Sequence, residues 1–149
     1  MTLIQKFFRL TSGEQKFLVK TSILLMAIQI GLHIMPFRKQ YRLLVRSASF
    51  TPLLHKPDPA YLQQVIWAIN KAGRTLLGPN TCLPQALAAH FLLKRQGFPA
   101  RMVIGVRKDE SGDFKAHAWV ENDGIVVIGG NHLELESYTT LPNLEDVLV

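Results

Sequence analysis

The sequence holds a single cysteine, Cys82, among its 149 residues. One thiol excludes an internal disulfide framework and a cysteine-rich zinc site. A lone thiol is usual in a reducing cytosol, and the start of the chain lacks the apolar run and small-residue cleavage site of a secretory signal, so we expect a cytoplasmic protein. His33, His55 and His132 show no ligand spacing, and we expect no metal site.

Acidic side chains are almost missing from residues 1–50, which hold eight basic side chains and only Glu14 to oppose them. Residues 51–149 hold nine basic and ten acidic side chains, so the net charge of +6 comes from the N-terminal third. A basic segment suits an acidic protein, a membrane surface or a nucleic acid. The sequence lacks an RNA-binding aromatic pattern, zinc-finger spacing and a recognition helix, so we expect no nucleic-acid partner. A peripheral membrane contact stays open.

Charged residues are also missing from the 17 residues Thr21–Phe37. A membrane-spanning helix needs about 20 apolar residues, and this segment also contains Gln29, His33 and Pro36. We interpret it as a hydrophobic helix that packs on the domain or on a partner. A spanning helix and an interfacial helix are the alternatives.

The pattern of apolar residues, caps and turns divides the chain in two. Residues 1–48 read as a hydrophobic and basic region of three helices, and residues 49–149 as the core of a second region. Pro52, Pro57 and Pro59 mark a linker over residues 49–60, and Asp58 followed by Pro59 predicts the start of the next helix.

Beyond residue 80 the pattern changes from a helix to strands. A helix is predicted from Cys82 to Gln96, ended by Gly97. Strands are predicted over residues 101–108, 114–121 and 125–128, with Asn122-Asp123-Gly124 as a tight turn. The tail reads as a short extended piece and one helical turn. The sequence therefore predicts an α+β fold in which the Cys-bearing helix packs on a small antiparallel sheet.

Cys82 follows Thr81, which suits the cap of the predicted helix, and so lies in the first turn. The positive end of the helix dipole and the unpaired backbone N–H groups favour a thiolate there, and the same N–H groups can stabilise an oxyanion. Asn80 is a further candidate oxyanion donor, and Gln85 suits that role or a solvated helix position. The alternative for Cys82 is a small buried hydrophobe.

His117 is a candidate base for this thiol. It follows Cys82 by 35 residues, past the helix and one strand, and lies on the next predicted strand. A helix packed on an antiparallel sheet can bring two such side chains together, in the chain order of papain-type Cys–His sites. The alternative is a polar residue on a solvated strand face. Trp119 suits either a core position or a shield over the site.

Several blocks of sequence carry a family resemblance. They are Thr81–Ala89, Leu92–Arg101, Ile104–Lys108 and Ala116–Glu121, with looser likeness at Met35–Arg38 and Tyr138–Pro142. Together they resemble the transglutaminase-like lasso peptide leader peptidases, the peptidase half of the split lasso peptide B protein. The resemblance implies a papain/transglutaminase-like fold.

The resemblance also implies an activity. Such enzymes hydrolyse the bond between the leader and the core of a ribosomally made precursor peptide. A leader-binding recognition protein presents the precursor, and an ATP-dependent lasso cyclase acts on the freed core. By this analogy Cys82 is the nucleophile, His117 is the base, and no cofactor is needed. A transglutaminase-like acyl or amine transferase and a non-catalytic peptide-binding module are the alternatives.

The third member of the site departs from the family, which has an Asp about a dozen residues after the His. Here that region reads Gly129-Gly130-Asn131, and Asn131 is our candidate to orient the imidazole. Asp123 would sit at the tip of the hairpin, whereas Glu121 shares the strand face of His117. A backbone carbonyl is the remaining possibility.

Overall fold

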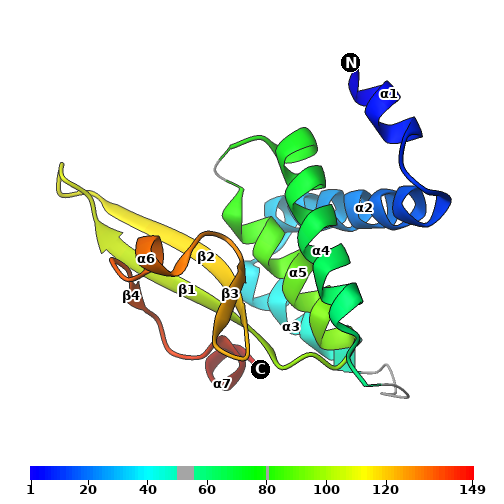
Figure 1. Ribbon diagram of the computed structural model, residues 1–149. Coiled ribbons are helices and arrows are strands. Elements are labelled where there is room, and N and C mark those ends of the chain that lie inside the picture. Colours follow the sequence, from blue (N-terminus) through cyan, green and yellow to red (C-terminus); the bar gives the residue numbers. More distant parts are fainter. Residues whose placement is uncertain (50–55, 80) are drawn as a thin grey trace.

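The computed structural model describes residues 1–49, 56–79 and 81–149. Residues 50–55 of the predicted linker, and Asn80, lie outside the described residues. A layer of helices lies beside a small antiparallel sheet, as Figure 1 shows. The predicted α+β fold, with a Cys-bearing helix against the sheet and helices at the N-terminus, is confirmed.

The N-terminal part contains three helices, as predicted: α1 (Leu3–Phe8), α2 (Ser12–Ile34) and α3 (Phe37–Ser49). Thr2 and Thr11 start the first two, because each side chain accepts a hydrogen bond from the backbone N–H of the third helical residue, and the backbone N–H of each threonine donates to the side chain of that residue. Pro36 separates α2 from α3, since its ring and its missing N–H interrupt a helix.

Helix α2 presents two different apolar faces. By length and composition it is apolar enough to cross a membrane, and 28% of its most apolar 18-residue stretch is buried. Leu18, Leu25 and Ile28 face inward, where α2 packs against α4 (Pro59–Ala72) and α5 (Cys82–Arg95). Ile23 and Ile30 are exposed on the outer face. The inner face therefore agrees with the interpretation of a helix packed on the domain.

Helix α4 begins as predicted, with Pro59 in its first turn and the Asp58 carboxylate accepting from the N–H of Ala60 at 2.9 Å. It continues into a π-helix, η1 (Gly73–Leu77). Between α2, α3, α4, α5 and the sheet lies one hydrophobic core, which includes Leu25, Tyr41, Val65, Ile69, Leu87, Leu93 and Val120. Side chains from both predicted regions share this core, and the boundary at residue 48 stays a prediction.

The sheet has the strand order β3-β2-β1-β4. Its strands are β1 (Ala100–Lys108), β2 (Phe114–Asn122), β3 (Ile125–Ile128) and β4 (Thr139–Thr140). Asp123 and Gly124 join β2 to β3 with φ of 51° and 77°, the paired left-handed residues of a tight hairpin turn. The short helices α6 (His132–Leu135) and α7 (Leu144–Leu148) flank β4 in the sequence.

A bulge shortens the pairing between β2 and β3. Glu121 pairs with Val126, but Val120 pairs with Ile128, so Val127 is an extra residue. The strand β3 then ends at Ile128. On the N-terminal side of Val120, the edge of β2 that faces away from β1 has no strand paired to it within residues 81–149. This uncovered edge of β2 positions the site.

The two faces of α2 predict different responses to truncation. Leu25 is 0% exposed, and Leu25→Ala should lower the free energy of unfolding by about 2–5 kcal/mol, because it removes buried methyl groups and leaves a cavity. Ile23 is 64% exposed, and Ile23→Ala should change it by no more than about 0.5 kcal/mol. Urea unfolding of both variants measures the difference. Equal losses would contradict the packing of α2 described above.

Candidate active site

Cys82 is the first residue of α5 and is half-buried. The helix dipole and the backbone N–H groups of the first turn therefore act on its sulfur. The predicted cap by Thr81 is wrong, because its side chain makes no capping bond. Its hydroxyl instead donates to the Gly78 carbonyl at 3.0 Å and accepts from the Gln85 amide at 3.0 Å. The N–H groups beside Cys82 are thus not capped by Thr81.

His117 and Cys82 meet at the uncovered edge of β2. Ala118 and Val120 face the core that α5 covers, whereas His117 and Trp119 share the opposite face of the strand. The two side chains nevertheless form a hydrogen bond, and the backbone N–H of Ala118 also bonds to the sulfur. Because β3 ends opposite Val120, this part of β2 is free to receive the thiol.

The pKa values of the two groups are shifted toward a thiolate and an imidazolium. The hydrogen bond from His117 lowers the pKa of Cys82, helped by the N–H groups of Ala118 and Leu83, against the opposing effect of burial. The same bond to Cys82 raises the pKa of His117, and the carboxylate of Glu134 adds to it. The two shifts favour the same charged pair, which is the nucleophilic state of a cysteine.

The second ring nitrogen of His117 is held by the backbone. Its Nε2 forms a hydrogen bond with the carbonyl oxygen of Gly129. A carbonyl only accepts hydrogen bonds, so Nε2 carries the proton and Nδ1 is left for the thiol. Of the alternatives from the sequence, the backbone carbonyl is the one found at this nitrogen.

The conformation at residue 129 requires glycine. Its φ is +99°, a region that side chains rarely adopt, and a Cβ there would lie 2.7 Å from the Ala118 oxygen and 2.8 Å from the Trp119 Cα. Both obstacles are backbone atoms of β2 and cannot rotate away. Gly129 therefore lets its carbonyl approach His117 closely.

The structure corrects the expected role of Asn131 as the partner of His117. Gly129 and Gly130 both have positive φ and end the extended chain, so Asn131 becomes the N-cap of α6. Its side-chain oxygen accepts from the N–H of Glu134 at 3.0 Å, and its side chain is exposed.

The two carboxylates considered for that role also lie elsewhere. Glu121 accepts from the Trp119 indole and from the Arg101 guanidinium, each at 3.0 Å. Asp123 is in the exposed hairpin turn, as predicted. A different carboxylate, Glu134, acts on the charge of His117. Glu134 lies on α6, a four-residue helix that no sequence pattern predicts.

Aromatic rings fix the other sides of the imidazole. The centre of the His117 ring lies 6.1 Å from Trp119 and 5.6 Å from Tyr138. Trp119 is 2% exposed and belongs to a second core cluster with Val103 and Leu135, so its core role and its contact with the site coincide. Gly105 pairs with His117 across the sheet, and a Cβ there would meet the Trp119 and Tyr138 side chains at 2.8 Å.

A cleft of about 820 Å3 opens beside this pair, and we call it the Cys82 cleft. It lies between η1 and the start of α5 on one side and β1, β2 and Gly129 on the other. It gives a substrate carbonyl access to the sulfur and to the first-turn N–H groups. Within residues 1–49, 56–79 and 81–149, no three His, Cys, Asp or Glu side chains are placed to hold a metal ion.

A cysteine and a histidine thus face one cleft on an α+β fold, and comparison with known proteins agrees with this arrangement. The family profile described as the transglutaminase-like superfamily matches residues 24–143. The chain belongs to the transglutaminase-like superfamily. This superfamily includes cysteine peptidases and transferases. No curated protein and no solved structure matches the chain.

The lowered pKa of Cys82 predicts its reactivity. Alkylation by iodoacetamide, followed against pH, should give an apparent pKa below the ordinary value of a thiol, because His117 stabilises the thiolate. His117→Ala should move that pKa upward and slow alkylation at neutral pH. The chain has one cysteine, so mass spectrometry reports this site alone. A profile that His117→Ala leaves unchanged would contradict the hydrogen bond.

The orienting carbonyl predicts a contrast between two nearby positions. Gly129→Ala should displace the carbonyl from His117 and shift the alkylation profile in the same direction as His117→Ala, because its Cβ would meet backbone atoms. Asn131→Ala should remove only a helix cap, at about 1 kcal/mol of unfolding free energy, and leave the profile unchanged. The reverse pattern would restore Asn131 as the partner of His117.

Proposed function

We propose that the chain is a cysteine peptidase that removes the leader from a ribosomally made lasso peptide precursor. The observation that carries the proposal is the hydrogen-bonded Cys82–His117 pair at the start of α5, with the pKa of the thiol lowered and that of the imidazole raised. The sequence blocks around both residues resemble the leader peptidases, and membership of the superfamily agrees with them.

Acylation follows from the charged pair. The Cys82 thiolate attacks the carbonyl carbon of the bond between leader and core, and the oxygen becomes an oxyanion. Backbone N–H groups in the first turn of α5 stabilise this oxyanion. His117 then donates a proton to the leaving amine, and the C–N bond breaks. The core peptide leaves with a free N-terminus, and the leader stays on Cys82 as a thioester.

Hydrolysis regenerates the enzyme. His117 is neutral after it has given up its proton, and its unprotonated nitrogen takes a proton from water as the water attacks the thioester. The C–S bond breaks, the leader leaves as a carboxylic acid, and Cys82 returns to its thiolate form. Throughout the cycle the Gly129 carbonyl holds the Nε2 proton and keeps the other nitrogen aimed at the reaction.

The alternatives differ in the group that accepts the acyl chain. A transferase would use the same thioester and pass the acyl group to an amine instead of water. The absence of the Asp that the family has after its His favours a non-catalytic binding module. The Gly129 carbonyl supports the catalytic alternative instead, because it supplies an acceptor for the imidazole.

The proposal implies three partners: the precursor peptide, a leader-binding recognition protein and a lasso cyclase. It also implies a cytoplasmic setting, where the precursor is made and where a lone thiol stays reduced. The hydrolysis itself uses no cofactor.

Reconstitution tests the activity. The chain should release the leader when it is incubated with a precursor peptide and its recognition protein, as followed by mass spectrometry. Cys82→Ala should lower the rate by a factor on the order of 10³ or more, because it removes the nucleophile. His117→Ala should lower the rate to a similar extent, because the steps depend on one unit.

The product distinguishes the candidates. Added primary amines should not become attached to the leader if water is the acceptor, and attachment in preference to hydrolysis would favour the transferase. Full cleavage by Cys82→Ala, or no cleavage by a folded wild-type protein with its partners, would contradict the peptidase proposal.

A further inference from the structure

The lining of the Cys82 cleft is positively charged, although residues 51–149 as a whole are close to neutral. Arg74 on η1, Arg107 on β1 and Lys115 on β2 line it, and none of the described residues that line it is acidic. Residues 51–149 as a whole hold ten acidic side chains against nine basic ones. The lining thus takes three of those nine cations and none of those ten acids.

Arg107 is fixed on the sheet side of the cleft. Its guanidinium lies 4.8 Å from the centre of the Tyr138 ring, and its Nη1 donates to the Ser137 hydroxyl at 3.1 Å. Neither contact neutralises its charge. A planar guanidinium can bind a carboxylate through two parallel hydrogen bonds. Tyr138 also contacts His117, so Arg107 stands next to the reacting pair.

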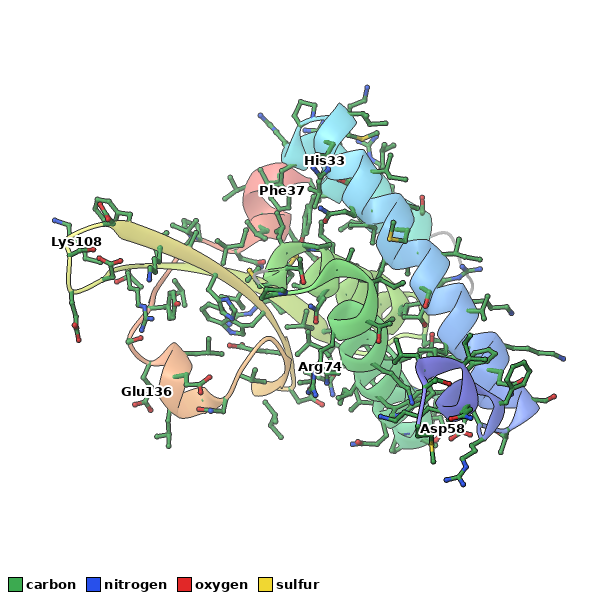
Figure 2. The ribbon with its side chains drawn as sticks, turned by 90° about the horizontal axis from the view of Figure 1, so that it is seen from above. His33, Phe37, Asp58, Arg74, Lys108 and Glu136 are labelled. Atoms are coloured by element: carbon green, nitrogen blue, oxygen red, sulfur yellow. The ribbon has the colours of Figure 1, made fainter. Side chains whose placement is uncertain are left out.

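Arg74 stands on the helical side of the cleft, where Figure 2 labels it. Among the described residues, neither Arg74 nor Arg107 forms an ion pair. The charge of Lys115 is offset by Asp109, whose carboxylate lies 3.4 Å from its Nζ. Glu134 lines the neighbouring hollow with Arg107 and His117, without an ion pair to Arg107 among the described residues. The uncompensated positive charge therefore rests on the two arginines, one on each wall.

We propose that the substrate of this site is an anionic peptide, with an Asp or Glu side chain close to the bond that is cleaved. Its carboxylate binds Arg107, and Arg74 adds attraction from the opposite wall. A concave site lined by one sign of charge attracts the opposite sign from solution. The peptide part of this inference rests on the proposed function, whereas the preference for a carboxylate does not.

Two alkylating reagents test the carboxylate preference without any peptidase activity. Iodoacetate carries a carboxylate and iodoacetamide does not, and both react with the one cysteine. The ratio of their rates should be higher for Cys82 than for free cysteine in the same buffer. Arg107→Gln should lower the ratio by about two- to fivefold, the range for a solvent-exposed charge pair. High salt should lower it as well.

Lys108→Gln is the matched control, because it removes the same charge from the next residue of β1 without touching the cleft lining. Figure 2 places Lys108 at the outer end of the sheet, away from Arg74. The ratio of the iodoacetate rate to the iodoacetamide rate in Lys108→Gln should equal that of the wild type. If circular dichroism shows that Arg107→Gln does not fold, Arg74→Gln answers the same question. A wild-type ratio in the folded arginine variant would overturn the proposal.

Peptide substrates then separate this inference from the proposed function. A precursor with its acidic residues near the cleavage site changed to Asn or Gln should show a higher KM, and the difference should shrink in Arg107→Gln. Equal cleavage of both peptides would overturn the inference and leave the peptidase standing. No cleavage of either peptide, with the reagent ratio still dependent on Arg107, would contradict the peptidase and retain the anionic ligand.

Discussion

The hydrogen bond between Cys82 and His117 is the interaction on which the site depends, and it exists because β3 is short. The bulge at Val127 and the end of β3 at Ile128 leave one edge of β2 uncovered. The start of α5 lies at that edge, so a thiol on one side of the sheet reaches an imidazole on the other. The same edge frees the Ala118 N–H for the sulfur.

Two glycines give the imidazole its surroundings. Gly129 places a carbonyl against Nε2, which fixes the tautomer and leaves the other nitrogen for the thiol. Gly105 makes room for the rings of Trp119 and Tyr138, which confine His117 from the sides. A backbone acceptor does for this histidine what a carboxylate does in many Cys–His sites, with the difference that it adds no full charge. The nearby Glu134 supplies part of that missing charge.

The sequence predicted the parts of the fold that local rules decide. Asp58 and Pro59 start α4, and Asp123-Gly124 closes the hairpin, because each is a helix start or a turn with its own chemistry. Cys82 and His117 were found because they lie in such elements. Asn131 does not reach His117, because a bulge in β3 and two glycines with positive φ turn the chain into α6. That geometry is set by contacts between distant segments, and no local pattern reports it.

Because Cys82 and His117 act on each other through one hydrogen bond, each should shift the pKa of the other. The direct test is an NMR titration of the His117 ring in the wild-type protein and in Cys82→Ala. Because the bond to Cys82 is the largest cause of the raised pKa, the variant should show a lower pKa for His117 than the wild type. The same pKa in both proteins, or a higher one in Cys82→Ala, would contradict the account.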